Sequence, residues 1–154
     1  MTTNKAPITI LMADDDDDDY VLTKKALKES KLLNTLVRVK DGEELLDYLF
    51  SRGDYEGQQT ARPGVILLDL NMPRLDGREA LKVIKSSPEF VNIPIIVFTT
   101  SKAEEDIYRS YQLGSNSFIT KPVTFENLIT VMKTLGMYWF EIVELPNATE
   151  YATK

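Results

Sequence analysis

The chain of 154 residues contains no cysteine and no histidine. The lack of cysteine excludes a disulfide framework, a thiolate metal site and a cysteine nucleophile. The lack of histidine excludes Ser-His catalysis, histidine–metal sites and phosphorylation of a histidine on this chain. Any chemistry that the chain supports must therefore depend on carboxylates, hydroxyls, amides and amines.

Long apolar stretches are also lacking. The longest runs, 65–68 and 93–98, are far shorter than the roughly 20 apolar residues that span a bilayer. Residues 1–7 are polar and do not form the apolar stretch of a secretory signal. We therefore expect a soluble, cytoplasmic protein with no membrane partner.

Positive charge is scarce, with 18 Lys and Arg residues against 24 Asp and Glu residues and a formal net charge of -6. Nonspecific binding to nucleic acid needs a basic surface, so we expect no nucleic-acid partner. A chain of this length, in which 43% of the residues are hydrophobic, is typical of one domain that buries its core without cross-links.

Short apolar runs alternate with segments of helical periodicity along the chain. The expected strands are 8–12, 36–39, 65–68, 95–98 and 117–120. The expected helices are 20–30, 45–50, 78–86, 103–113 and 124 to about 142, and 51–63 is expected to be a solvated loop. The fivefold alternation predicts an α/β fold, a parallel sheet with helices on both faces.

Polar side chains follow four of the five expected strands. They are Asp14, Asp15, Asp69, Asn71, Thr99, Thr100 and Lys121. Ligands of such sheets bind beyond the carboxyl ends of the strands, so we expect these side chains to converge at one edge.

Crowded carboxylates repel one another, and a hard divalent cation relieves that repulsion. Mg²⁺ prefers oxygen ligands, usually one or two carboxylates with waters and phosphate oxygens. Asp15 and Asp69 are expected to bind Mg²⁺ (or Mn²⁺) directly and Asp14 directly or through water, with the backbone carbonyl of Asn71 as a further ligand.

With a cation in place, a carboxylate oxygen of Asp69 can attack a phosphoryl group and form an acyl phosphate. Phosphoryl transfer depends mainly on positioning and charge neutralisation. The ammonium of Lys121 would hold one phosphoryl oxygen, and the hydroxyl of Thr99 would donate to another.

Four stretches of the chain together resemble the response-regulator receiver family, over residues 7 to 135. They are Ile10-Leu11-Met12-Ala13-Asp14-Asp15, Leu67-Leu68-Asp69-Leu70-Asn71-Met72-Pro73 with Asp76-Gly77, Val97-Phe98-Thr99-Thr100-Ser101, and Ile119-Thr120-Lys121-Pro122. Each alone is a weak signal, but their order and spacing together are specific to the family.

The resemblance implies a (βα)5 flavodoxin-like fold, Mg²⁺ dependence, and phosphorylation of Asp69 by a histidine kinase or phosphotransfer protein. It also implies a cis peptide bond between Lys121 and Pro122. Thr99, Thr100 and Phe118 are implied to read the phosphorylated state: Thr99 moves toward the phosphoryl group and the Phe118 ring turns inward. The implied receiver domain covers 7–145, followed by a short tail, 146–154, without an output domain.

A narrower resemblance is to the phytochrome-associated, single-domain response regulators of bacteria. It depends on the 51–63 loop, the Thr99-Thr100-Ser101-Lys102 run and the tail from Tyr138 to Ile142 with Leu145-Pro146. It implies a kinase that senses light and a receiver that forms homodimers. The expected dimer surface lies on the fourth and fifth helices and the tail, with Tyr108, Tyr111, Met132, Tyr138, Trp139 and Phe140.

Less specific interpretations stay open for several of these residues. Asp16 to Asp19 suit a solvated run that caps a helix, Thr99 suits a helix cap, and Phe118 suits simple core packing. Tyr138 to Phe140 suit a tail packed on its own domain.

Three other functions compete with the receiver. A phosphatase of the aspartyl-phosphate class also uses a strand-end Asp, but it needs a second Asp two positions later, where this chain has Asn71. A flavodoxin-type redox module is disfavoured because the run of aspartates after the first strand would repel a flavin phosphate. A transcription factor is disfavoured by the short segment after the last helix and by the negative charge, so we expect a signalling protein and not an enzyme.

Overall fold

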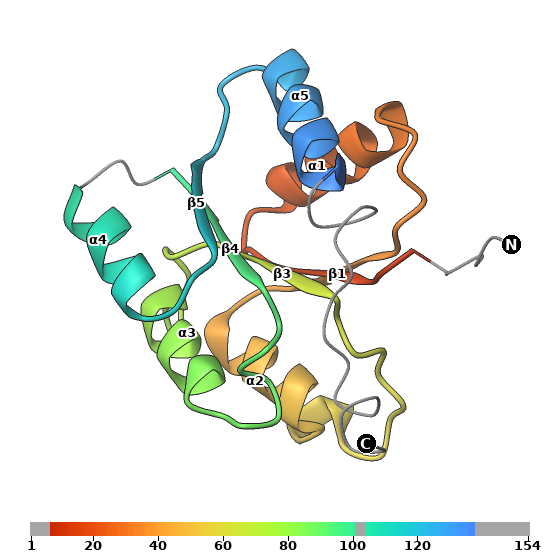
Figure 1. Cartoon of the computed structure of the whole chain (residues 1–154). Helices are drawn as coiled ribbons and strands as arrows, with labels where there is room; N and C mark the ends of the chain where they lie inside the picture. The colour runs from red at the N-terminus through yellow and green to blue at the C-terminus, as the bar shows by residue number, and fades with distance from the viewer. Residues whose placement is uncertain (1–6, 101–103, 138–154) are drawn as a thin grey trace, which may run out of the picture.

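The computed structural model describes residues 7–100 and 104–137. In this part of the chain a five-stranded parallel sheet lies between two layers of helices (Figure 1). The strands are β1 (Ile10–Ala13), β2 (Leu36–Val39), β3 (Val65–Leu68), β4 (Ile95–Thr99) and β5 (Ser117–Thr120), in the order β2-β1-β3-β4-β5. The expected (βα)5 flavodoxin-like fold is confirmed.

Helices cover both faces of the sheet. They are α1 (Asp17–Glu29), α2 (Gly42–Phe50), α3 (Gly77–Lys85), α4 (Glu104–Gln112) and α5 (Phe125–Leu135). Helices α1 and α5 pack on one face, α2 and α3 pack on the other, and α4 lies beside β5 (Figure 1).

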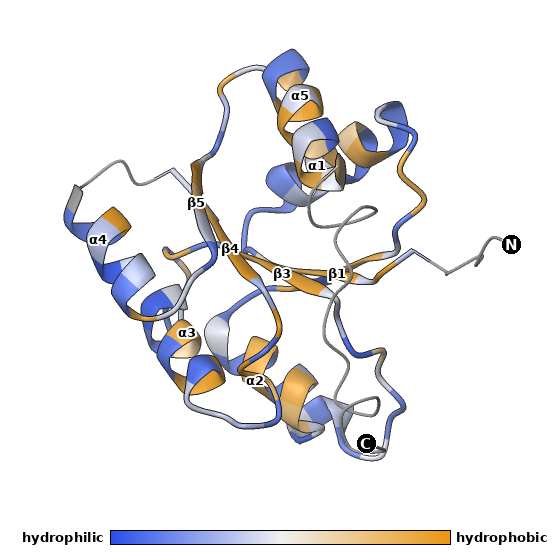
Figure 2. Ribbon diagram, in the orientation of Figure 1, coloured by the Kyte–Doolittle hydropathy of each residue, from blue (hydrophilic) through white to orange (hydrophobic). Residues whose placement is uncertain are grey.

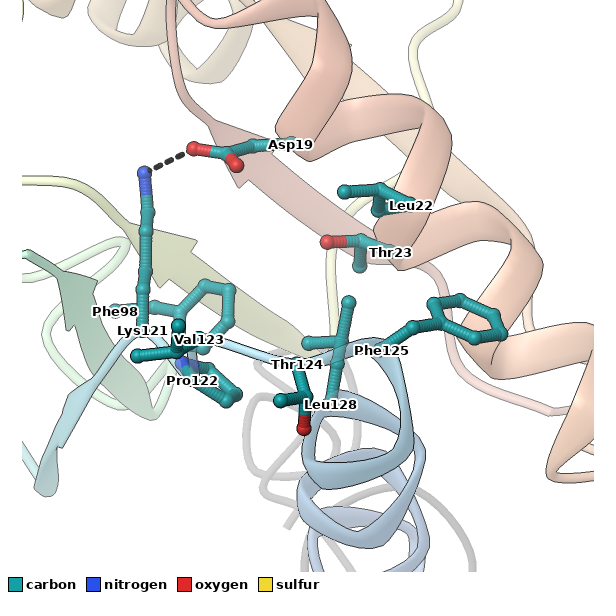
Figure 3. Close-up of a pocket in the computed structure, with 10 residues that line it drawn as sticks. All are labelled: Asp19, Leu22, Thr23, Phe98, Lys121, Pro122, Val123, Thr124, Phe125 and Leu128. Carbon is teal, nitrogen blue, oxygen red and sulfur yellow. Dashed lines mark hydrogen bonds and ion pairs between the residues drawn. The ribbon is translucent and has the colours of Figure 1, made fainter.

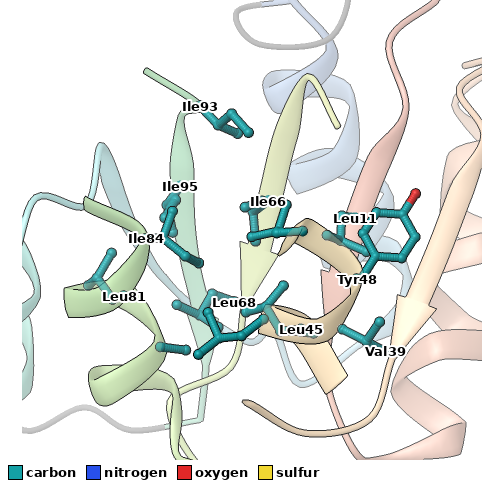
Figure 4. Packing of buried hydrophobic residues seen from close by; sticks show 14 of the residues in the cluster. Leu11, Val39, Leu45, Tyr48, Ile66, Leu68, Leu81, Ile84, Ile93 and Ile95 are labelled. Carbon is teal, nitrogen blue, oxygen red and sulfur yellow. The ribbon is translucent and has the colours of Figure 1, made fainter. Parts of the chain in front are cut away.

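The central strands are apolar on both faces because both faces are covered (Figure 2). Leu11 of β1 and Ile66 and Leu68 of β3 point into the core beneath α2 and α3, which Figure 4 shows from close by. Met12 and Leu67 point into the core beneath α1 and α5. Each such side chain contributes roughly 1.5–3 kcal/mol when it is fully buried, so the carboxyl ends of β1 and β3 are firmly held.

Side chains just before the helices set where the helices begin. Asp16, Asp41, Asp76 and Thr124 each accept a hydrogen bond from a backbone N–H in the first turn of α1, α2, α3 and α5, respectively. Helix α1 therefore begins at Asp17, three residues before its expected start. The apolar periodicity misses these residues because the first turn of α1 is acidic, which suits the positive end of the helix dipole.

The segment 51–63 is more ordered than the expected solvated loop. Gly53–Tyr55 form a 3₁₀ helix, η1. The Tyr55 hydroxyl donates to a carboxylate oxygen of Glu44 at 2.6 Å, and the Tyr48 hydroxyl donates to the carbonyl of Ala61 at 2.8 Å. Two tyrosines thus attach both parts of the segment to the domain.

The last described helix, α5, ends at Leu135, and the rest of its expected extension, 138–142, lies outside the described residues. Over residues 7–100 and 104–137, no helix combines the length and the apolar character that crossing a bilayer requires.

Candidate functional site

The carboxyl ends of four strands bring the expected polar side chains together. Asp14 follows β1, Asp69 follows β3, Thr99 ends β4 and Lys121 follows β5. Asp14, Asp69 and Thr99 are buried, at 1%, 6% and 0% exposure. Side chains that are far apart in the chain therefore share one partly enclosed site.

Three carboxylates form the acidic part of this site. Oxygens of Asp14, Asp15 and Asp69 lie within 4.8 Å of one another, and Asp15 is exposed while the other two are buried. Three convergent carboxylate oxygens with an opening to solvent fit a hard divalent cation, Mg²⁺ or Mn²⁺. The expected ligands thus lie together, and Asn71 follows them with its backbone N–H 3.1 Å from Oδ1 of Asp69.

Lys121 is the cation of the site. Its Nζ lies 2.7 Å from Oδ2 of Asp14, 2.7 Å from Oδ2 of Asp19 and 3.1 Å from Oδ2 of Asp69. Burial by itself lowers the pKa of Lys121, but the hydrogen bonds to Asp14 and Asp19 and the charge of Asp69 outweigh it, so the pKa lies above its ordinary value. The side chain is therefore a fixed positive charge in reach of the Asp69 carboxylate.

The other oxygen of Asp69 is held by β4. The Thr99 hydroxyl donates to Oδ1 of Asp69 at 2.8 Å, and the Asn71 side-chain amide lies 3.5 Å from the Thr99 oxygen. Thr99 ends a strand, and its hydroxyl lies beside the Asp69 carboxylate, as the sequence predicted.

Burial is the largest influence on Asp14 and raises its pKa to about 6, although Lys121 and the backbone N–H of Asp16 act in the opposite direction. Desolvation disfavours the charged form, and a bound cation would restore it. The chemistry of Asp14 therefore also fits a metal ligand.

We expect the affinity for Mg²⁺ to fall as the pH drops below about 6, because Asp14 then takes up a proton that the cation must displace. At a pH above the pKa of Asp14, the carboxylate is ionised and free to bind the cation. At a pH below that pKa, the Mg²⁺ affinity falls by up to about tenfold per pH unit. Calorimetric titration at pH 5, 6 and 7.5 measures this. Asp14→Asn is the control and should lose this part of the pH dependence, and equal affinities for the wild-type protein at pH 5 and 7.5 would contradict the expectation.

The aspartates of the run 14–19 have different structural roles, which the sequence alone did not distinguish. Asp16 caps α1, and Asp17 forms an ion pair with Arg38 of β2. Arg38 also donates to the backbone carbonyl of Asp14 at 3.1 Å and so secures the turn after β1. Asp19 reaches Lys121. Sequence reasoning missed the roles of Asp19 and Arg38.

Gly77 supports the segment after Asp69. A Cβ at Gly77 would lie 2.2 Å from the backbone oxygen of Asp69, and the Gly77 N–H donates to the carbonyl of Leu70 at 3.0 Å. Only a residue without a side chain allows this close approach.

Gly77→Ala should therefore displace Asp69 and lower both stability, by about 1–3 kcal/mol, and phosphoryl uptake. Urea unfolding and labelling with acetyl phosphate measure the two effects. Gly57→Ala is a control: Gly57 has a positive φ of 77° but open space around it, so this change should lower stability without reducing the rate of labelling. Normal labelling of Gly77→Ala would show that the close approach does not position Asp69.

The structure also bears on the expected cis bond before Pro122 and on the surroundings of Phe118 and Thr100. The peptide bonds of residues 7–100 and 104–137 include no cis bond, so the expected cis bond before Pro122 is wrong for this structure. The trans isomer is intrinsically preferred, by about 0.5–1 kcal/mol, and Lys121 reaches the site from it. Phe118 is half-buried against the core beneath α2 and α3, in line with core packing, and Thr100 is exposed.

One residue of the expected dimer surface, Met132, is contradicted by its burial. Met132 lies on the face of α5 that packs against the core, where its side chain is fully buried. It is therefore not a surface residue. Tyr108 and Tyr111 of α4 are 67% and 50% exposed. Tyr138, Trp139 and Phe140 lie outside the described residues.

Comparison with known proteins places the site in a family. The model of the response regulator receiver domain matches residues 10–133. The response regulator Rcp1 of Synechocystis sp. is 38% identical over 142 residues, which are 92% of this chain and 95% of that protein.

Solved structures agree. The phosphorylated cyanobacterial phytochrome response regulator RcpA has a TM-score of 0.84 at 39% identity, covering 92% of this chain and 100% of that one. The Mn²⁺-bound form of Rcp1 has a TM-score of 0.83 at 38% identity, with the same coverage. With the family model matching most of its length and with relatives this similar, the chain belongs to the response regulator receiver domain family.

Proposed function

We propose that Asp69 is the phosphoryl acceptor of this response regulator and that a divalent cation at Asp14, Asp15 and Asp69 is required for its phosphorylation. Receiver domains of response regulators take phosphoryl groups from histidine kinases. The observation that carries the proposal is the pair of donors on Asp69, Lys121 on one carboxylate oxygen and Thr99 on the other.

The chemistry follows from these contacts. A carboxylate oxygen of Asp69 attacks the phosphorus of the kinase's phosphohistidine. An O–P bond forms, and the P–N bond of the phosphohistidine breaks. The imidazole nitrogen keeps the electron pair and regains a proton from solvent. Lys121 neutralises one phosphoryl oxygen and Thr99 donates to a second. Asp14, Asp15, Asp69 and the backbone carbonyl of Asn71 would hold the cation, which would supply positive charge against the phosphoryl group.

An acceptor, and not a phosphatase, is supported by Asn71. An amide cannot serve as the acid or base that a phosphatase places two residues after its nucleophile. Acetyl phosphate with Mg²⁺ tests the proposal: the protein should take up one phosphoryl group per chain and then stop. Sustained turnover of a generic phosphate ester would contradict it and favour the phosphatase.

A light-sensing histidine kinase is the proposed phosphoryl source. The support is the similarity to RcpA, which is described as a phytochrome response regulator. We place the protein in the cytoplasm, where such kinases transfer phosphoryl groups, and propose that 7–145 act as one receiver that signals through protein contacts. Thr99 and Phe118 are the proposed switch residues, with Thr100 beside them.

We propose a homodimer that uses α4. Its support is the exposure of Tyr108 and Tyr111, aromatic residues on the same helix.

Replacing both tyrosines by Ser should weaken the dimer by roughly tenfold or more, because aromatic side chains dominate interface energies. Sedimentation at micromolar concentration, with and without beryllofluoride, measures this, and Val21→Ser, at an exposed position of α1, is the control. A monomer in both states would remove the proposal.

A further inference from the structure

One carboxylate of the site belongs neither to the acidic cluster nor to the acceptor. Oδ2 of Asp19, in the first part of α1, lies 2.7 Å from Nζ of Lys121 (Figure 3). The two residues are 102 positions apart in the chain. The lysine side chain is 9% exposed and that of Asp19 is 30% exposed, so their contact lies at the mouth of the site.

The ammonium of Lys121 is shared among carboxylates: it donates hydrogen bonds to Asp19 and Asp69 and forms an ion pair with Asp14. An ammonium has three N–H donors, and three carboxylates surround this one: Asp14, Asp19 and Asp69. Asp14 and Asp69 also belong to the cluster of carboxylates that fits a cation, and Asp19 does not. Nor does the Asp19 carboxylate cap α1, because Asp16 does so.

From this we infer that Asp19 is a positioning residue that restrains phosphorylation: it holds the Lys121 ammonium in the unphosphorylated protein and competes with the phosphoryl group for it. The inference rests on the proposed role of Asp69. A phosphoryl oxygen that arrives at Asp69 needs a donor from Lys121, and the bond to Asp19 is the one that can be given up without loss of a cation ligand. Asp19 and Lys121 both line a cavity of about 60 Å³, so their contact borders open space (Figure 3).

The negative charge of Asp19 should slow phosphorylation as well, in addition to its competition for Lys121. The site holds four carboxylates, those of Asp14, Asp15, Asp19 and Asp69, and one ammonium, so it stays negative even with a divalent cation. A phosphoryl donor is an anion, and a negative charge a few ångströms from its path slows its approach. Asp14 and Asp69 also hold Lys121, so the loss of Asp19 leaves the ammonium in place.

Asp19→Asn should therefore accelerate labelling by acetyl phosphate in Mg²⁺ roughly threefold to tenfold. The matched control is Asp18→Asn, which makes the same change in net charge at an exposed position of the same turn. Lys121 pairs with Asp14, Asp19 and Asp69 and not with Asp18. The labelling rate of this control should stay within about twofold of wild type. Asp19→Glu keeps the charge and should return the rate toward wild type. Asp19→Ala removes the acceptor altogether and should repeat the acceleration.

Mg²⁺ affinity, measured by calorimetry, separates this role from a metal-binding one. It should be the same for Asp19→Asn and Asp18→Asn, while their labelling rates differ. Equal labelling rates for these two variants, or slower labelling of Asp19→Asn and Asp19→Ala than of wild type, would overturn the inference while leaving Asp69 as the acceptor. Failure to label the wild-type protein would overturn the proposed function and the inference with it.

Discussion

Asp69→Asn should abolish phosphoryl uptake from acetyl phosphate in Mg²⁺. An amide oxygen carries no negative charge and cannot form the acyl phosphate that a carboxylate forms, while the side chain keeps its size and one oxygen for Lys121 or Thr99. Intact-mass spectrometry after a timed incubation measures the loss, which should be at least a hundredfold in rate.

The fold should survive this change because Lys121 keeps Asp14 and Asp19 as partners and the removed charge lies among other carboxylates that repel it. Thermal unfolding should therefore show no loss of stability in the metal-free protein. Asp54→Asn, which changes an exposed carboxylate of η1, is the control and should label at the wild-type rate. Undiminished labelling of Asp69→Asn would refute the assignment of the acceptor.

Lys121→Ala should have the second-largest effect, a reduction of labelling by roughly tenfold or more, since a fixed cation that faces the transferring group is lost. It should also destabilise the metal-free protein by about 3–5 kcal/mol, because Asp14 and Asp69 are buried and lose their partner. Mg²⁺ should restore more stability to this variant than to wild type, since the cation replaces the missing charge.

Denaturant unfolding in EDTA and in Mg²⁺, together with labelling rates, measures the two effects. Lys133→Ala, an exposed lysine of α5, is the control and should change neither. If Lys121→Ala labelled normally, the ammonium would have no part in the transfer. If it were as stable as wild type in EDTA, the buried ion pairs would contribute nothing to folding.

The sequence predicted most of the fold because its signals are local. Apolar runs such as Val65 to Leu68 are continuous, as strands buried on both faces are, and β2, β3 and β5 have the expected bounds. Parallel strands separated by helices must then return to one edge, which brings Asp14, Asp69, Thr99 and Lys121 together. The site could be predicted because the topology, and not fine packing, positions these residues.

Side-chain direction was harder to predict. In the run 14–19 all six residues are identical, so no sequence pattern distinguishes the cap Asp16 from the lysine partner Asp19. Their tasks depend on where the first turn of α1 points each side chain relative to β5. Met132 was placed on the surface because apolar residues near a terminus suggest an interface, yet the rotation of α5 against α1 buries it.

The isomer of the Lys121–Pro122 peptide bond was not predicted correctly from the sequence. The expected cis form came only from the family resemblance, and no property of the neighbouring residues distinguishes the isomers beforehand, because the two forms of such a bond differ by only about 0.5–1 kcal/mol. In the structure the bond is trans and the lysine still contacts Asp14 and Asp69.

The role of Asp69 is tested most directly by locating the phosphoryl group itself. Wild-type protein is incubated with acetyl phosphate and Mg²⁺, digested, and fragmented in a mass spectrometer under conditions that preserve acyl phosphates. We expect one phosphoryl group, on the peptide that contains Asp69, and none when EDTA replaces Mg²⁺. A phosphoryl group on any other residue, or equal labelling in EDTA, would contradict the proposed metal-dependent acceptor.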